Sequence, residues 1–446
     1  MQEDRTGTGY LRSREALGTI MLRQIPATER YALTINRCGA DRYTKTSYPF
    51  HCGIYSEIVT PEAFFHFNLN NEIIRIIGRG TAWPHPQEWL KRTCGNDWVY
   101  YSTGGYTGVF ETTGEYYLPN LSYPTNKSMG GSPLELPEVR KMVETWYPLL
   151  QKGCSRLQET LETGSDEALF LDRVLENSPE RLRERTERLL DITGGHISVL
   201  PPDTRHVDYN VIPVAISRGC LYKCTFCRVK NEIPFHRLPI TEIEGQLDRL
   251  QAFFGPELGN GYGLFLGEHD GLAAGPARIC YGIEEGYRRL GLTGSFFKTG
   301  MTFMFGSVSS LLGAPGSLFA ELERLPGRIC INIGFESADQ RTLDQLGKPI
   351  SESDVIEAFL RSQEINDTFQ SVEITANFVI DETLPATHFT ALSTLLRDRV
   401  NRSRSKGSIY LSPMQFEDPR RSKLFLFYRY KCLSRLPLFL YTIQRW

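Results

Sequence analysis

Short apolar runs alternate with segments of helical spacing from residue 211 onward. Because strands joined through helices run parallel and cross over with one hand, this rhythm predicts an α/β fold, a partial (β/α)6 barrel of the TIM type. We expect functional side chains at the carboxyl ends of its strands. The predicted strands are 211–217, 262–266, 295–299, 329–335, 372–380 and 408–412. The helices predicted after the second of these strands are 275–290, 309–325, 339–347, 352–364 and 386–400.

The first helix of this region has the clearest pattern. Thr241 and Glu244 have the spacing of a capping box at its start. Apolar residues then recur on one face from Ile243 to Phe254, and Gly255 ends the pattern. We therefore expect this helix to begin at Thr241 and to pack one face on the sheet.

Residues 1–204 follow a different pattern, rich in Tyr, Trp and Gly. Residues 61–80 predict paired strands, while 136–152 and 166–191 have helical spacing. Glycines and prolines in 194–210 break this pattern, so we expect a separate α+β domain over 1–204 that shapes or covers a substrate pocket, followed by the barrel over 205–412. The basic, aromatic segment 413–446 predicts either a helix packed on the barrel or an amphipathic surface helix.

Composition narrows the class of protein. Of 446 residues, 41% are apolar and 23% charged, as in ordinary globular proteins, and 50 Lys and Arg nearly balance 52 Asp and Glu. The sequence has no stripe of basic residues of the kind that indicates nucleic-acid binding. The first residues carry no apolar signal, and no apolar span of about 20 residues precedes position 420, so we expect a cytoplasmic protein without a transmembrane segment. Its ten cysteines should then be reduced, which favours metal or redox chemistry for any tight cluster.

One such cluster follows the first predicted barrel strand. Cys220, Cys224 and Cys227 lie within eight residues, so they can surround one metal centre without closing a long loop. A structural zinc ion and an electron-transfer [4Fe-4S] cluster each take four protein ligands. Three ligands would leave one iron open to another molecule.

This loop, SRGCLYKCTFCRVKN, resembles the CxxxCxxC signature of the radical S-adenosylmethionine superfamily, over residues of about 205 to 412. The resemblance implies a [4Fe-4S] cluster on Cys220, Cys224 and Cys227, whose open iron chelates S-adenosylmethionine. In that family the reduced cluster cleaves the cofactor to a 5′-deoxyadenosyl radical that abstracts hydrogen from a substrate. It also implies an electron donor such as flavodoxin or ferredoxin.

Two further segments carry the resemblance near the cofactor. Phe226 matches the aromatic residue that packs near the adenine in the family. The segment LFLGEHDGLAA resembles the Gly-Gly-Glu region that binds the cofactor's amino group, with Gly-Glu-His-Asp in its place. Gly267 would allow close backbone approach there, and either Glu268 or Asp270 would contact the cofactor.

The fourth predicted strand runs into INIGFESADQRTLDQLGK, which resembles elongator-type and coproporphyrinogen-dehydrogenase-type members. By this resemblance, Glu336 and Ser337 lie at the ribose or methionine end of the cofactor. Ser337 or Asp339 is expected to cap the next helix. Lys348 is expected to be a solvated charge or a charge at a helix carboxyl end rather than a catalytic group.

An alternative is a non-catalytic module that binds zinc or an iron–sulfur cluster and senses redox state or stabilises a complex. It would need a fourth protein ligand, for which His236 and Cys280 are candidates. The remaining cysteines form no CxxC pair and are expected to be mostly buried apolar residues. No Walker loop, dinucleotide-binding motif or Ser-His-Asp grouping is found.

Overall fold

The computed structural model describes most of the chain in detail. The described residues are 31–41, 53–79, 81, 83, 89–92, 96, 98–101, 112–113, 136–195, 200–207, 210–227, 233–261, 263–267, 269–297, 300–414 and 421–441.

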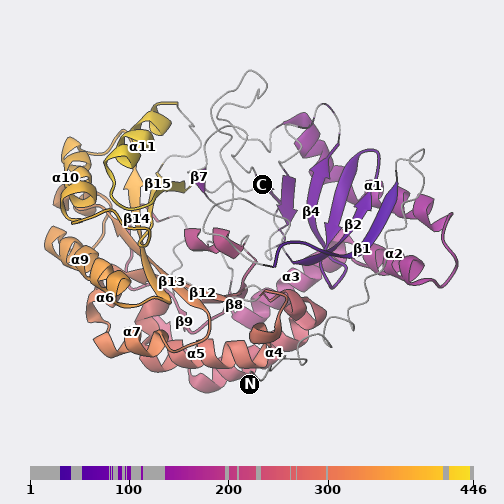
Figure 1. Ribbon diagram of the computed structural model, residues 1–446, viewed down its shortest axis with the longest axis horizontal. Helices are drawn as coiled ribbons and strands as arrows, with labels where there is room; N and C mark the ends of the chain where they lie inside the picture. Colours follow the sequence, from indigo (N-terminus) through magenta and orange to yellow (C-terminus); the bar gives the residue numbers. More distant parts are fainter. Residues whose placement is uncertain are drawn as a thin grey trace, which may run out of the picture.

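The first described unit is a six-stranded antiparallel sheet with strands in chain order, backed by helices (Figure 1). Its β3 and β4 confirm the paired strands predicted at 61–80. One face buries Phe65, Phe67 and Ile76 against Trp146 and Phe170 of the helices. The strands are β1 (Ala32–Cys38), β2 (Ile54–Val59), β3 (Ala63–Phe67), β4 (Ile73–Gly78), β5 (Trp89–Arg92) and β6 (Trp98–Tyr101), and the first two helices are α1 (Pro137–Gln158) and α2 (Asp166–Glu176).

The helical spacing at 166–191 is confirmed, and it is divided between two helices, α2 and α3 (Pro179–Thr193). Ser178 is the N-cap of α3 and accepts a hydrogen bond from the amide of Arg181. Pro179 has no N–H to donate, so it suits the first turn of a helix and not the middle of one.

The second unit is an all-parallel sheet in the order β7-β16-β15-β14-β13-β12-β11-β8. Five of the six predicted strands are confirmed within a few residues. Pairings among the described residues leave β8 and β7 at the edges, so closure into a barrel, partial or complete, stays a prediction. The strands are β7 (Thr112–Thr113), β8 (Ile212–Val214), β11 (Gly263–Leu266), β12 (Met301–Ser307), β13 (Arg328–Glu336), β14 (Val372–Ile380), β15 (Ile409–Pro413) and β16 (Leu438–Tyr441).

The strand predicted at 295–299 is wrong, since β12 begins at Met301. Phe297 precedes β12 in the chain and is buried in a cluster with apolar residues from both units. The amide of the neighbouring Phe296 donates to the carbonyl of Gly259. The apolar run therefore marks a buried connection. The segment predicted as a tail also supplies β16, and the two-residue β7 pairs with it.

Helices cover the outer side of the parallel sheet, as Figure 1 shows. The capping box predicted at Thr241 and Glu244 is wrong: α4 begins at Ile240 after Pro239 without a side-chain cap, and Glu244 pairs with Arg289. The helix predicted at 309–325 is broken into α6 and α7 at Pro315. The helices are α4 (Ile240–Phe254), α5 (Pro276–Arg289), α6 (Val308–Gly313), α7 (Gly316–Leu322), α8 (Gln340–Gln345), α9 (Glu352–Thr368), α10 (Ala386–Asp398) and α11 (Arg421–Leu433).

Helix α11 packs on the rest of this unit. This agrees with the first alternative predicted for segment 413–446, a packed helix, and not with a surface helix. Phe427 and Tyr430 are buried, and Tyr430 stacks on Phe389 of α10 with ring centroids 6.4 Å apart. Among the described helices, none has the length and apolar character needed to cross a bilayer.

The two units meet at the edge of the parallel sheet where its strands begin. The side chain of Asn260 bonds both the amide and the carbonyl of Ile54 at 2.8 Å, much as a strand would. Beside this junction, the 3₁₀ helix Pro202–Val207 places Asp203 within 2.6 Å of both the Tyr410 and the Thr375 hydroxyls. The described antiparallel strands thus lie at the amino edge of the parallel sheet.

Candidate functional site

The cysteine loop starts at the opposite, carboxyl edge of the parallel sheet. After β8 the chain forms the short β9 (Ser217–Arg218), which pairs with β10 (His236–Arg237). Cys220 bridges to Pro234 just beyond this pair. A narrow hairpin base therefore holds the loop against the sheet end, where functional groups gather in parallel α/β folds.

The three predicted ligands are neighbours. Cys224 is 8% exposed, and Cys220 and Cys227 are half-buried. Burial raises the pKa of Cys224 to about 11, with Lys348 opposing the shift and Glu336, Cys220 and Cys227 adding to it. Burial likewise raises the pKa of Cys220, which the Tyr222 amide lowers and Asp270 and Cys227 raise. Each thiol thus lies within electrostatic reach of the other two.

Gly219 determines how the loop leaves the sheet. Its φ of +74° favours glycine, and an added Cβ would lie 2.5 Å from the carbonyl oxygen of Ile233 and 2.7 Å from that of Pro234. We expect Gly219→Ala to displace Cys220 and to lower the iron content after reconstitution, while the far-ultraviolet circular dichroism is kept. Gly291→Ala is the matched control, because its φ is +65° but no atom lies within 4 Å of the added Cβ. Equal iron contents in the two variants would contradict this role.

Contacts from α6 and from the end of α8 fix the middle of the loop. The Tyr222 hydroxyl donates to the Ser309 hydroxyl at 2.6 Å and accepts from the Ser309 amide at 3.1 Å. The amide of Thr225 donates to the carbonyl of Leu346 at 3.0 Å. These bonds hold the segment between Cys220 and Cys227 from both sides.

A buried ion pair lies beside the loop. Glu336 ends β13 with a φ of +65°, a strained conformation for a non-glycine residue, and its Oε1 is 3.0 Å from Lys348 Nζ. Lys348 also donates to the carbonyl of Gly334 at 2.5 Å and lies 5.7 Å from the centre of the Tyr222 ring. Glu336 Oε2 is buried without a hydrogen-bond partner. Strain and an unpaired oxygen indicate a functional group.

Of the two alternatives predicted for Lys348, the solvated charge is wrong, since only 6% of the residue is exposed. The residue does follow the carboxyl end of α8, and its amide donates to the carbonyl of Leu343. Gly347, with φ of +64°, turns the chain after α8 so that Lys348 points back under the cysteine loop. The Leu-Gly-Lys sequence is the signal for this turn, because a glycine after a helix often takes a left-handed conformation.

The segment after β11 approaches the same region. Gly267 has φ of +78°, and an added Cβ would lie 2.8 Å from the Cα of Gly271, so this position requires glycine, while its contact with a cofactor stays a prediction. Asp270 is 1% exposed, and burial raises its pKa while the Ser307 and Ser310 hydroxyls oppose the shift. Its Oδ1 accepts from the Ala273 amide at 3.2 Å. Glu268 lies outside the described residues.

Ser337 is buried, and Phe226 is half-buried. The Ser337 hydroxyl accepts from the amide of Asp339 at 3.0 Å and bonds His388 Nδ1 at 2.8 Å. Asp339 is the N-cap of α8, as predicted. Phe226 packs with Leu346, Val379 and Leu384. His388, which the sequence did not single out, thereby fixes the turn that carries Glu336.

The two candidates for a fourth ligand have other partners. His236 is exposed on β10, with Nδ1 3.2 Å from the carbonyl of Pro234. The Cys280 thiol lies 3.6 Å from Glu321 Oε2, between α5 and α7. In the part of the chain that the structure describes, no three His, Cys, Asp or Glu side chains are arranged to hold a single metal ion. The thiolates of a cubane bind different irons, so such a cluster requires neighbouring sulfurs rather than donors that converge on one ion.

Outside this loop, the described cysteines only partly match the expectation of burial. Cys154 and Cys330 are buried, whereas Cys38 and Cys432 are exposed. Burial raises the pKa of Cys154 to about 12, so its thiol stays protonated and behaves as a small apolar group.

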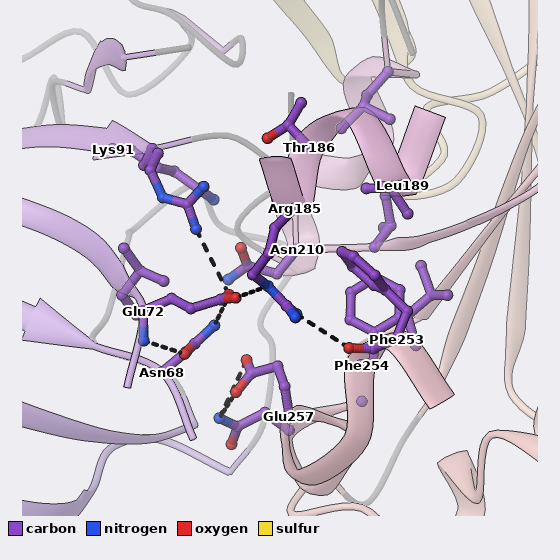
Figure 2. Close-up of a pocket in the computed structure, with 17 residues that line it drawn as sticks. Asn68, Glu72, Lys91, Arg185, Thr186, Leu189, Asn210, Phe253, Phe254 and Glu257 are labelled. Carbon is purple, nitrogen blue, oxygen red and sulfur yellow. Dashed lines mark hydrogen bonds and ion pairs between the residues drawn. The ribbon is translucent and has the colours of Figure 1, made fainter. Parts of the chain in front are cut away.

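A separate cavity of about 130 Å³ lies at the junction of the two units (Figure 2). The end of α4 and the turn after it form one wall, and β4, β5 and α3 form others. Glu72 lies between Asn68 and Arg185 in Figure 2, and Glu257 faces them from the turn. Because Val211 and Gly261 precede strands, this cavity is at the amino edge, opposite the cysteine loop.

Glu257 should make the stability of the junction depend on pH. Burial raises its pKa to about 8, with the Leu69 amide and Asn260 opposing and Glu72 adding to the shift. Between about pH 4.5 and 8 the folded chain keeps a proton that the unfolded chain has lost, so the free energy of unfolding falls as pH rises, by at most about 1.4 kcal/mol per unit. Urea unfolding across this range should give a flatter profile for Glu257→Gln. The same slope in that variant would assign the dependence to another group.

Comparisons with known proteins give no family assignment. No family model and no curated protein matches the sequence. Among solved structures, the cobalamin-dependent S-adenosylmethionine radical enzyme OxsB aligns with 45% of this chain at 16% identity and a TM-score of 0.31, and the alignment spans 28% of OxsB. Methylornithine synthase (PylB) aligns over 67% of this chain and 77% of its own, at 15% identity and a TM-score of 0.32. A radical SAM methyltransferase from Sphaerobacter thermophilus aligns over 52% of this chain and 67% of its own, again at 15% identity and a TM-score of 0.32.

Proposed function

We propose that this chain is a radical S-adenosylmethionine enzyme of the cytoplasm whose Cys220, Cys224 and Cys227 hold a [4Fe-4S] cluster. One observation carries the proposal: three neighbouring thiols with CxxxCxxC spacing lie at the carboxyl edge of a parallel sheet, in the loop that follows β8 and β9. Thiolates are the protein ligands of iron–sulfur clusters, and three of them leave one iron for the cofactor.

The residues around the loop fit such a group. When bound, the reduced cluster would supply the electron that cleaves S-adenosylmethionine to a 5′-deoxyadenosyl radical, which abstracts hydrogen from the substrate. Glu336 presents a buried carboxylate oxygen without a partner, suited to an ammonium or hydroxyl group. Asp270 presents a buried carboxyl group beside it in the proposed site. Lys348 places a positive charge beside thiols that become thiolates on cluster binding. Burial of these groups excludes water and strengthens their electrostatic interactions.

The proposed roles follow the segments that carry the resemblance. Gly267, Glu268 and Asp270 hold the methionyl end of the cofactor. Glu336 and Ser337 form the turn at its ribose or methionine end, in the manner of the elongator and coproporphyrinogen-dehydrogenase branch. Phe226 packs near the adenine, and a flavodoxin or ferredoxin supplies the electron. The domain boundaries near 204 and 412 belong to this proposal, as does the role of the first domain in shaping the substrate pocket.

The experiment is anaerobic reconstitution of the full chain with iron and sulfide, followed by metal analysis and by dithionite with S-adenosylmethionine. We expect about four irons and four sulfides per chain, brown visible absorbance, and 5′-deoxyadenosine as product. A fully loaded cluster that yields no 5′-deoxyadenosine would exclude the proposed activity. One colourless zinc ion per chain would instead support the non-catalytic module.

A further inference from the structure

The carboxyl end of β13 is irregular at the point where it carries Glu336. The pairing with β14 shifts between Gly334 and Glu336, so β13 has one residue more than its partner there. The amide of Ser337 donates to the carbonyl of Phe335 at 2.9 Å, which closes the backbone over Glu336 in a three-residue turn. Such a bulge changes the direction of a side chain at a strand end. Because Glu336 has φ of +65°, this turn persists only if its surroundings hold it.

Ser337 connects the turn to two helices. Its hydroxyl accepts from the amide of Asp339, the N-cap of α8, at 3.0 Å, and it lies 2.8 Å from Nδ1 of His388 on α10. Ser337 and His388 are both 0% exposed. Water therefore cannot replace this bond, and a polar group left unpaired here would be costly.

His388 is fixed before it bonds the turn. Its amide donates to the carbonyl of Pro385 at 3.0 Å in the first turn of α10. Burial lowers the pKa of the imidazole, with the backbone of Val379 and the charge of Asp339 opposing the shift. The ring is therefore neutral at pH 7, and it pairs with Ser337 through a hydrogen bond and not through charge.

The side chain of Glu336 has a separate support. Lys348 pairs with its Oε1 at 3.0 Å, while Oε2 is buried without a hydrogen-bond partner. Lys348 thus holds one carboxylate oxygen, and the bond between Ser337 and His388 holds the backbone that carries it. The position of the free oxygen depends on both supports, since a relaxed backbone would rotate the carboxylate about Lys348.

The first turn of α10 also reaches the cysteine loop. Phe389, the residue after His388, packs on the same buried apolar cluster as Phe226 of that loop. One helical turn therefore contacts both the strained turn at Glu336 and the segment that carries the three thiols.

We propose that His388 is a positioning residue for Glu336: through the hydroxyl of Ser337 it holds the strained turn and with it the free carboxylate oxygen. The effect on the cofactor rests on the function proposed above, in which Glu336 lies at the cofactor. The hold on the turn does not depend on that function, because each of its bonds lies within the chain.

Two amide substitutions of His388 test the hold on the turn in the full apo chain. His388→Asn carries its polar atoms on Cγ, the atom to which Nδ1 is bonded in histidine, so it can still reach Ser337. His388→Gln carries them one carbon farther. Hydrogen exchange of the Ser337 amide should be about tenfold faster in His388→Gln and unchanged in His388→Asn. Equal exchange rates in the two variants would overturn the hold on the turn.

The reconstituted chain tests the effect on the cofactor. S-adenosylmethionine is titrated against the electron paramagnetic resonance signal of the reduced cluster. We expect His388→Gln to weaken its affinity about tenfold and His388→Asn to keep it, with equal iron contents in both. General damage to the fold would lower the iron content as well.

A double variant shows whether His388 acts through Ser337. In a Ser337→Ala background, His388→Gln should cause no further loss of affinity, and additive losses would overturn the proposal. A loaded wild-type cluster that does not respond to S-adenosylmethionine would contradict the proposed function, and the cofactor role of His388 with it. A responsive wild type with full affinity in His388→Gln would overturn the role of His388 alone.

Discussion

Replacing any one of Cys220, Cys224 and Cys227 by serine is expected to abolish cluster incorporation and the formation of 5′-deoxyadenosine. A serine hydroxyl stays protonated near neutral pH and is a poor ligand for iron in place of a thiolate. Loss of an outer contact alone lowers affinity or activity at metal sites about 10–100-fold, so loss of a ligand should exceed ~100-fold. Iron and sulfide content, visible absorbance and product formation measure the loss.

Cys38→Ser and Cys432→Ser are the controls, since both thiols are exposed and lie outside the loop. They should keep full cluster content and product formation. Thermal unfolding of each apo variant separates loss of the cluster from loss of the fold. If the loop variants kept the cluster, or the controls lost it, the ligands would have to lie elsewhere in the chain.

The parallel sheet was largely predictable because its strands are buried on both faces. Such strands form continuous apolar runs, as in residues 329–335 and 372–380, and these runs became β13 and β14. The failure at 295–299 has the same cause, since a buried connection such as that of Phe297 presents the same run of apolar side chains. A run of apolar residues predicts that a segment is buried. It predicts a strand correctly only where the buried segment is also a strand.

The part of the candidate site that lies within one loop could be predicted from the spacing of its residues. The parts formed by segments far apart in the chain could not. Cys220, Cys224 and Cys227 form a constellation within one loop. The pair between Glu336 and Lys348 depends on a left-handed turn at Gly347 and on a strained Glu336, so its partners are brought together only by tertiary structure. The described lining of the cavity at the amino edge comes from several separate segments of the chain, none of which carries a motif.

The Glu336–Lys348 pair should also dominate the stability of the site. Both side chains are less than 10% exposed, so Lys348→Met would leave a buried carboxylate without its counter-charge. Such a loss costs about 3–5 kcal/mol in the free energy of unfolding, measured by urea denaturation of the apo protein. Lys152→Met is the matched control: Lys152 is 59% exposed in its pair with Glu62, and exposed pairs contribute less than about 1 kcal/mol.

A double variant separates the unpaired charge from lost packing. Glu336→Gln removes the negative charge, so in combination with Lys348→Met it should recover much of the lost stability, because an uncharged amide costs less to bury than an unpaired carboxylate. The recovered fold should still bind S-adenosylmethionine poorly after reconstitution, since the amide replaces the free carboxylate oxygen proposed to face the cofactor. A double variant no more stable than Lys348→Met would contradict this explanation. Lys348 would then stabilise the site through its contacts with the Gly334 carbonyl and the Tyr222 ring, and not through its charge pair with Glu336.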